Sequence, residues 1–425
     1  MNAPDMQRAR IALPYFRALG WEPVVLAVTP GSVEGAVLDP LFEHTYPADI
    51  RVIRVQGIPS KFTRWLGIGS LWWRCGRALR KAGDELLATE KFDLVFFTTT
   101  QFDAFTFGPR WLRRFGVPYV LDYQDPWIND YYRLTRTKPP GGWLRFSFSQ
   151  YTARRREPHA VNEAGAIISV SAKYNDELRE RYPAYDTGQL YHLPFGAAAA
   201  DLEMARKLKP AQPLVPADDG KVHLVYAGRC GPDMNRALSL LFRAFRFYRQ
   251  SAPAEAARLH FHFIGTGYAP PPLGQNSVLP VAEKEGVADQ VTEVCYRVPY
   301  FDALHALVRA NALIVVGSDD ASYSASKIFP YLLARRPLLA VVHKDSLMLT
   351  LAREQNPDAG FGFENDPPKE SGDMLARRIC DDWFAQKKWE SPPTGDMEAL
   401  EPHLAAGMTR RLVAIFDQVL KSPKA

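Results

Sequence analysis

Short apolar runs alternate with helix-length amphipathic segments along the whole chain. Several of these runs are apolar throughout, which is typical of strands that helices cover on both faces. In the N-terminal half the expected strands are 22–28, 51–55, 92–98, 118–123, 166–171 and 189–193. In the C-terminal half they are 222–227, 259–264, 291–296, 313–316 and 338–342. The alternation predicts an α/β protein with two doubly wound, Rossmann-like domains built on parallel sheets.

A segment without a clear strand separates the two sets of runs. Residues 197–220 contain three prolines and end in a turn-like Asp-Asp-Gly, a composition typical of a linker. A helical pattern follows much later, from Leu400 to Leu420. The expected organisation is an N-terminal domain at 1–200, a linker at 201–220, a C-terminal domain at 221–395, and a final segment at 396–425 whose helix packs back on the N-terminal domain.

The chain begins on a pattern that indicates a helix, from Asp5 to Leu19, before the first expected strand. In alternating α/β proteins such a helix follows a buried strand. Either the strand order starts unusually, or, as we expect, the N-terminal domain lacks its first strand in this sequence.

Length and composition narrow the class without naming a function. The 425 residues suit two or three domains of roughly 150 residues each. With 52 basic and 47 acidic residues, the net charge of +5 does not predict a nucleic-acid-binding protein. The four cysteines lie too far apart in sequence for a zinc or disulfide framework, so we expect a reducing, cytoplasmic location. The sequence contains no HExxH, Walker lysine, GxSxG or catalytic Cys/His signature, and we expect no metal and no cofactor.

Turns after three expected strands of the C-terminal half carry residue types that bind phosphate. These are Gly228 with Arg229, Gly265 with Gly267, and Ser326 with Lys327. Glycines allow the backbone to approach a ligand, and a helix N-terminus beside a cation favours anions. The same residues also fit a surface arginine after a tight turn, glycines required for positive φ, and a capped helix with a solvated lysine.

Polar residues also follow two expected strands of the N-terminal half. Asp122, Tyr123 and Asp125 close the run at 118–123, and a carboxylate there is suited to act as a general base or to orient a hydroxyl. The preceding run leads to Thr100, Gln101 and Asp103, which are candidates to line the same site. Asp before Pro is also a frequent turn opener, so a structural role for Asp125 competes with the catalytic one.

Two stretches, 61–81 and 143–156, interleave arginines and lysines with aromatic residues. This composition suits a helix that touches an anionic membrane surface. A helix packed on the core with a solvated basic face explains the first stretch equally well.

Several of these segments together resemble the GT-B glycosyltransferases, and within them the retaining family 4, in its bacterial polysaccharide and lipid branch. The resemblance lies in Asp122-Tyr123-Gln124-Asp125-Pro126-Trp127, in Gly228-Arg229, in Gly265-Thr266-Gly267 and in Ser326-Lys327-Ile328-Phe329. Arg236 occupies the place of a second cation that the family has in the helix after Gly-Arg.

The resemblance implies two Rossmann-like domains facing a cleft and transfer of a sugar from a nucleotide-diphosphate donor to a hydroxyl on a polysaccharide, glycan or lipid. The donor would be bound by Gly228, Arg229, Arg236, Gly265, Gly267, Ser326 and Lys327. The acceptor would face Asp122, Asp125, Tyr123, Thr100, Gln101 and Asp103. Together with the basic and aromatic stretches at 61–81 and 143–156, the resemblance predicts a cytoplasmic protein, peripheral on the inner face of the cell membrane, that acts in polysaccharide biosynthesis.

One departure from the family keeps a second hypothesis open. Pro330 stands where the family has a glutamate that binds the donor ribose, and proline has neither a carboxylate nor a backbone donor. A GT-B protein that binds a nucleotide, a sugar or a partner without turnover is therefore the alternative. A GT-B sugar-nucleotide epimerase is a third hypothesis, but the acid/base residues that it needs are not evident.

Overall fold

The computed structural model describes residues 6–34, 39–63, 70–134, 136, 138–139, 141–217, 219–267, 269, 273–320, 328–365 and 371–421. The chain forms two compact units. Unit 1 comprises Met1–Gly196 and Ala405–Ala425, and unit 2 comprises Ala197–Leu404.

Unit 1 contains two parallel sheets. Its strands are β1 (Val24–Val28), β2 (Arg51–Val55), β3 (Val95–Thr98), β4 (Tyr119–Tyr123), β5 (Ala166–Ser169) and β6 (Leu190–His192). Strands β1 and β2 pair with each other, and the remaining four form a sheet in the order β3-β4-β5-β6. All the residues of β4 and β5 are buried, as strands covered on both faces require.

Eight α-helices belong to unit 1 among the described residues. They are α1 (Gln7–Phe16), α2 (Ser60–Thr63), α3 (Leu71–Thr89), α4 (Phe107–Phe115), α5 (Tyr131–Leu134), α6 (Gly142–Asn162), α7 (Ala172–Arg181) and α16 (Ala405–Lys421). The last of these comes from the far end of the chain. Its Phe416 packs on Phe16 of α1 and Phe96 of β3, with ring centroids 6.3 and 5.1 Å apart. Aromatic contacts thus hold α16 to unit 1.

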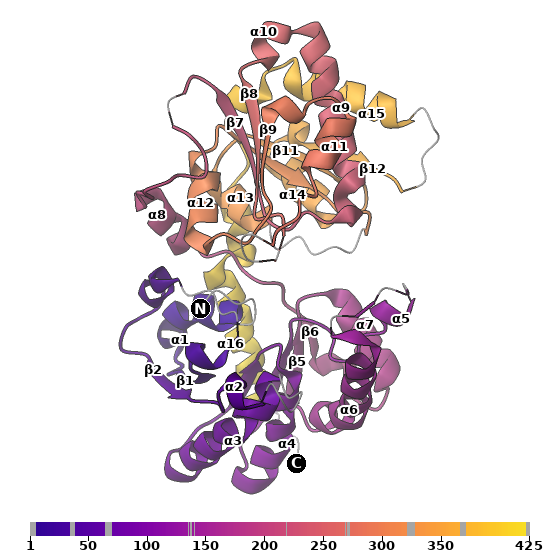
Figure 1. The fold of residues 1–425 in the computed structure, drawn as a ribbon. Coiled ribbons are helices and arrows are strands. Elements are labelled where there is room, and N and C mark those ends of the chain that lie inside the picture. Colours follow the sequence, from indigo (N-terminus) through magenta and orange to yellow (C-terminus); the bar gives the residue numbers. More distant parts are fainter. Residues whose placement is uncertain are drawn as a thin grey trace. The chain divides into compact units, whose positions relative to one another are not determined.

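Unit 2 is built on one six-stranded parallel sheet. Its strands are β7 (Val222–Ala227), β8 (Leu259–Ile264), β9 (Val291–Val294), β10 (Ala312–Val316), β11 (Leu338–His343) and β12 (Gly360–Phe363). Their order is β12-β11-β10-β7-β8-β9. The helices are α8 (Ala199–Lys207), α9 (Asn235–Ser251), α10 (Pro253–Ala256), α11 (Leu279–Lys284), α12 (Tyr300–Arg309), α13 (Ile328–Ala334), α14 (Leu347–Gln355) and α15 (Ser371–Ile379). Figure 1 shows α8 and α12 on one side of this sheet and α9 and α11 on the other.

The expected α/β class and parallel sheets are confirmed, with three differences in detail. Strand β12 is additional to the expected set. The segment 201–220, expected to be a linker, begins inside α8, where Asp201 and Leu202 are buried in unit 2. The helix expected from Leu400 begins at Ala405, after a short 3-10 helix at Glu398–His403.

Candidate functional site

The strand order of unit 2 points to one place for a ligand. From the central strand β7 the chain moves to β8 on one side, whereas β10 lies on its other side. Open α/β sheets bind ligands outside the carboxyl ends of their strands at such a switch point, where the loops diverge. The loops that follow β7 and β10 meet there, because the Asp319 amide donates a hydrogen bond of 2.9 Å to the Asp233 carbonyl.

The carboxyl end of β7 is fixed by hydrogen bonds from two directions. The Gly228 amide donates to the Ile264 carbonyl at 2.8 Å, and the backbone there has φ of 146°, which favours glycine. The Tyr331 hydroxyl of α13 accepts from the Ala227 amide at 2.7 Å and donates to the Ala227 carbonyl at 2.9 Å. The turn that carries Arg229 therefore starts from a rigid point.

Arg229 is held by a carboxylate one helical turn further along the chain. Its Nη2 lies 2.5 Å from Asp233 Oδ1 and its Nη1 lies 3.1 Å from Oδ2, in a bidentate ion pair. Burial works to raise the pKa of Asp233, but hydrogen bonding and charge from Arg229 outweigh it, so the net pKa lies below its ordinary value. The Arg229 side chain remains about a third exposed, at 31%, so it is oriented and still open to solvent.

Arg236, in the first turn of α9, connects to the same loops. Its Nη1 donates to the Asn365 carbonyl at 2.5 Å, just beyond β12. The Asn365 side-chain amide in turn donates to the Asp319 carbonyl at 2.7 Å. The loops after β7, β10 and β12 thus form one network, with two arginines in it.

The glycines after β8 are required by local geometry. Gly265 has φ of 71°, and a Cβ on Gly267 would lie 2.4 Å from the Cys295 carbonyl oxygen. Both observations explain glycine at these positions without a ligand.

Glu293 of β9 ties the same loop to the beginning of α11. Its carboxylate accepts from the Thr266 hydroxyl at 2.6 Å and from the amides of Ser277, Val278 and Leu279 at 2.9–3.0 Å. The Glu293 carboxylate therefore satisfies three backbone N–H donors at the beginning of α11 and fixes the loop after β8.

The third expected donor element lies partly outside what can be described. Ser326 and Lys327 are not among the described residues. Helix α13 begins at Ile328, so Pro330 lies in its first turn, where the missing proline N–H breaks no intrahelical hydrogen bond.

In unit 1, Asp122 of β4 is the counter-charge of an arginine. Its Oδ2 accepts from Arg8 Nε at 2.7 Å and from Thr98 Oγ1 at 2.8 Å, and both side chains of the ion pair are 0% exposed. Arg8 also donates to the Leu193 carbonyl at 2.7 Å. Because this carboxylate is fully buried and paired, the structure gives Asp122 a positioning role.

Asp125 differs from Asp122 in its exposure to solvent and in its lack of a described partner. Its side chain is exposed and has no hydrogen-bond or ion-pair partner among the residues that the structure describes. Reduced solvation by the surrounding protein nevertheless raises its pKa above the ordinary aspartate value. A carboxyl group that is accessible and holds its proton more tightly is suited to proton transfer.

The remaining residues expected on this side divide into two groups. Thr100 and Gln101 follow β3 and are half-buried, so they remain candidates. Asp103 is ion-paired with Arg156. Tyr123 is 1% exposed and donates its hydroxyl to Glu157 at 3.2 Å inside the core, which explains its presence without a substrate.

Comparisons with known proteins concern the fold and the family of residues 10–189. Residues 10–189 match the family model described as the glycosyl transferase 4-like domain. Solved structures of the GT-B fold match along nearly the whole chain. HepE of Anabaena in complex with UDP and glucose is 13% identical, with 98% of this chain and 96% of that chain covered and a TM-score of 0.55.

The chain has the GT-B fold.

Two further structures show the same fold. A glycosyltransferase from Rickettsia africae is 14% identical over 98% of this chain and 95% of that chain, with a TM-score of 0.52. A UDP-forming alpha,alpha-trehalose-phosphate synthase from Burkholderia vietnamiensis is 13% identical over 93% of this chain and 100% of that chain, with a TM-score of 0.51. Among curated proteins no match was found.

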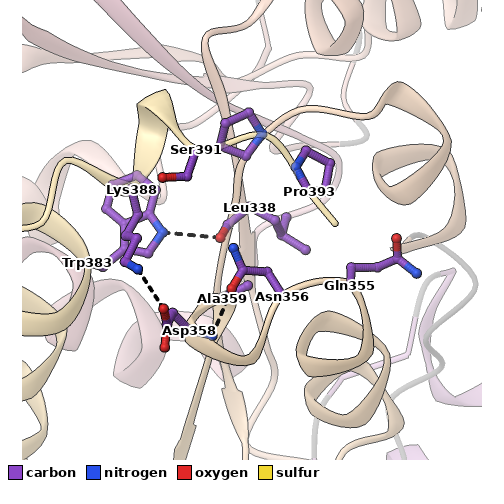
Figure 2. Close-up of a pocket in the computed structure, with 10 residues that line it drawn as sticks. Leu338, Gln355, Asn356, Asp358, Ala359, Trp383, Lys388, Ser391 and Pro393 are labelled. Atoms are coloured by element: carbon purple, nitrogen blue, oxygen red, sulfur yellow. Dashed lines mark hydrogen bonds and ion pairs between the residues drawn. The ribbon is translucent and has the colours of Figure 1, made fainter. Parts of the chain in front are cut away.

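A small cavity of unit 2 lies away from the switch point. It has a volume of about 10 Å³ and is lined by residues at the amino end of β11, including Leu338, Asp358, Trp383 and Lys388. Figure 2 shows the Lys388–Asp358 ion pair and the hydrogen bond from the Trp383 ring to the Leu338 carbonyl beside it. This volume has room for roughly one water molecule, so the cavity is not a sugar site.

The described residues form neither a metal-binding cluster nor a membrane-spanning helix. In the described ranges no three His, Cys, Asp or Glu side chains are grouped so that they could hold a metal ion. Within the same ranges, every helix is too short or too polar to cross a bilayer.

Three residues that stabilise the candidate donor site were not expected from sequence. The Arg229 side chain is held by Asp233. The loop after β8 is held by Glu293, and the end of β7 by Tyr331. Asp233 follows Arg229 at a spacing of i+4, which is the only signal in the sequence that hints at this pairing. Glu293 and Tyr331 contact parts of the chain that are distant in sequence.

Proposed function

We propose that this protein is a glycosyltransferase that moves a sugar from a nucleotide-diphosphate sugar to a hydroxyl group, with the donor diphosphate bound at the switch point of unit 2. The observation that carries this proposal is Arg229, oriented by Asp233 and partly exposed where the loops after β7 and β10 meet. A guanidinium binds phosphate oxygens in a bidentate geometry. UDP in the HepE structure makes a uridine diphosphate the first donor to test.

The charge on the leaving diphosphate sets the main electrostatic demand of this reaction. Two negative phosphates develop further charge as the bond to the sugar breaks, and fixed cations that are already oriented stabilise it without reorganisation. Arg229 supplies the first cation, and Arg236, in the first turn of α9, supplies the second. We extend the proposal to Ser326 and Lys327, which precede α13 in sequence.

The acceptor belongs to unit 1 in this proposal. Asp125 is the candidate to receive or orient the hydroxyl proton of the acceptor, supported by its exposure and its raised pKa. Thr100 and Gln101, which follow β3, are the candidate hydrogen-bonding residues beside it. Asp122 contributes by fixing β4 through Arg8 and does not contact the substrate.

We further propose that the acceptor hydroxyl is carried by a glycan or a lipid, and that the protein works on the cytoplasmic face of a membrane without spanning it. Support comes from the basic and aromatic composition of helix α6 in unit 1.

Two measurements test the donor site: calorimetric titration with nucleoside diphosphates and an assay of sugar transfer. In the titration we expect the wild type to bind. In the transfer assay we expect Arg229→Ala to be slower by about 10²–10³-fold, the range found when one preorganised transition-state donor is removed. The control is Arg249→Ala, because Arg249 lies in the last turn of α9 and pairs with Asp289. Equal rates for Arg229→Ala and the wild type would remove Arg229 from the site. Binding without any turnover would favour the alternative of a protein that only binds its ligand.

A further inference from the structure

Helix α6 of unit 1 carries an apolar stripe that no described part of the chain covers. Leu144, Phe148 and Tyr151 are 90%, 58% and 54% exposed. They are spaced i, i+4 and i+7, so they lie on one face of the helix. Trp143, at the start of the helix, adds a further exposed ring at 44%.

This stripe is separate from the face that α6 buries in the core. Phe146, Gln150 and Ala153 are buried, and each follows a member of the exposed stripe by two residues. Glu157 is also buried and follows Arg155 by two residues. Two residues correspond to about 200° around a helix of 3.6 residues per turn, so the two stripes point in nearly opposite directions. Packing of unit 1 therefore does not explain the apolar side chains at 144, 148 and 151.

The charges of α6 select the kind of partner. The helix contains four arginines, of which Arg154 is paired with Asp130 and Arg156 with Asp103. Its single acidic residue, Glu157, is 0% exposed and bound to Tyr182 and Arg181. Arg155 continues the exposed stripe at i+11 and places its guanidinium 4.7 Å from the centre of the Tyr151 ring. The exposed stripe is thus apolar and ends in the cation of Arg155, with no acidic side chain of its own helix.

We infer that this stripe of α6 is the surface with which the protein lies on an anionic lipid membrane, an inference that gives a location to the membrane contact included in the proposed function. Leucine and phenylalanine enter the boundary of the acyl chains, tryptophan and tyrosine lie at the headgroup level, and arginines pair with anionic headgroups. A second copy of this chain is a poorer occupant, because a symmetric contact would bring cationic faces together.

The other basic and aromatic stretch does not offer the same surface. In α3, Trp72 packs on Phe107 with ring centroids 5.1 Å apart, and Arg74 and Cys75 are buried. Of the aromatic residues at the start of this helix only Trp73 is exposed, so the alternative of a core-packed helix describes it well.

Co-sedimentation of the full chain with vesicles tests the inference. We expect binding to vesicles that mix phosphatidylcholine with phosphatidylglycerol, weaker binding to phosphatidylcholine alone, and a decrease of about tenfold or more for the double variant Leu144→Ser/Phe148→Ser. The matched control is Leu273→Ser/Met374→Ser, which removes two exposed apolar side chains from unit 2, 70% and 62% exposed. Unchanged thermal unfolding of both double variants shows that the fold is kept.

Three results would overturn the inference. The first is wild-type protein that ignores anionic vesicles, and the second is equal vesicle binding by the α6 variant and the control. The third is a dimer, detected by light scattering, that only the α6 variant loses, because the stripe would then bind a second copy. Vesicle binding is measured without donor or acceptor, so failure here leaves the transfer reaction untouched. Wild-type protein that transfers no sugar to a water-soluble acceptor would instead count against the proposed function.

Discussion

Replacing Asp122 by alanine separates a structural role of this carboxylate from a catalytic one. Asp122 and Arg8 are both 0% exposed, with 2.7 Å between Oδ2 and Nε. Alanine would leave the Arg8 guanidinium buried without its counter-charge, although its hydrogen bond to the Leu193 carbonyl would remain. Removal of one partner from a buried ion pair costs about 3–5 kcal/mol of the free energy of unfolding.

That cost converts into a large change in thermal stability. For a domain of roughly 200 residues, 1 kcal/mol corresponds to about 2–4 °C in Tm, so the transition of unit 1 should fall by roughly 6–20 °C. Differential scanning calorimetry of the full chain measures it. The control is Asp49→Ala, in which an exposed aspartate loses its ion pair with Arg17 and Tm should not change measurably.

A rescue variant makes the reasoning refutable. In Arg8→Met/Asp122→Leu both charges are removed, so much of the stability lost in Asp122→Ala should return. Wild-type Tm in Asp122→Ala together with lost transfer would show that Asp122 acts in the reaction. A double variant as unstable as the single one would show that the ion pair is not the cause.

Three further predictions concern unit 2. Asp233→Asn should lower the transfer rate by about tenfold with little change in Tm, because the neutral amide orients Arg229 less firmly; steady-state kinetics measure it. Gly267→Ala should cost about 1–3 kcal/mol in chemical denaturation, since the added Cβ would lie 2.4 Å from the Cys295 carbonyl oxygen. Burial and the neighbouring imidazoles lower the pKa of His262 to about 3. As pH falls, the imidazole is therefore protonated in the unfolded state at a higher pH than in the folded state. Stability of unit 2 should therefore decrease by about 2 kcal/mol between pH 6.5 and pH 5, and His262→Gln should flatten this decrease.

Each of these predictions has an outcome that contradicts it. Full activity of Asp233→Asn would mean that Arg229 needs no orienting carboxylate, and Asp373→Asn is the control because Asp373 is an exposed partner of Arg243. An alanine at position 267 that leaves the denaturation midpoint unchanged would show that the loop after β8 relaxes. Identical pH profiles for His262→Gln and the wild type would assign the acid sensitivity to other groups.

Most of the sheets could be predicted because parallel strands covered on both faces are apolar along their whole length. Strands β7 and β8 coincide with the expected runs 222–227 and 259–264. Strand ends are less well defined, since β3 begins at Val95 within the run 92–98. Strand β12 was not expected because two of its four residues, Gly360 and Gly362, are glycines, which are typical of loops.

The candidate site could be predicted in part, for a physical reason. Glycine followed by arginine after a buried strand indicates Arg229 from local sequence alone. The roles of Asp122 and Glu293 depend on contacts between residues far apart in the chain, such as the pair of Arg8 with Asp122, 114 positions apart. A pattern within one segment contains no information on which charge will lie beside it, so burial and pairing had to come from the structure.

The most direct test of the central claim is release of nucleoside diphosphate from a panel of nucleotide-diphosphate sugars, with simultaneous detection of a glycosylated hydroxyl acceptor. We predict that the wild type releases the diphosphate and transfers the sugar from at least one donor, that Arg229→Ala is slower by about 10²–10³-fold, and that Arg249→Ala is as fast as the wild type. Wild-type protein that neither binds nor consumes any donor of the panel, or Arg229→Ala protein that works at the wild-type rate, would contradict the account.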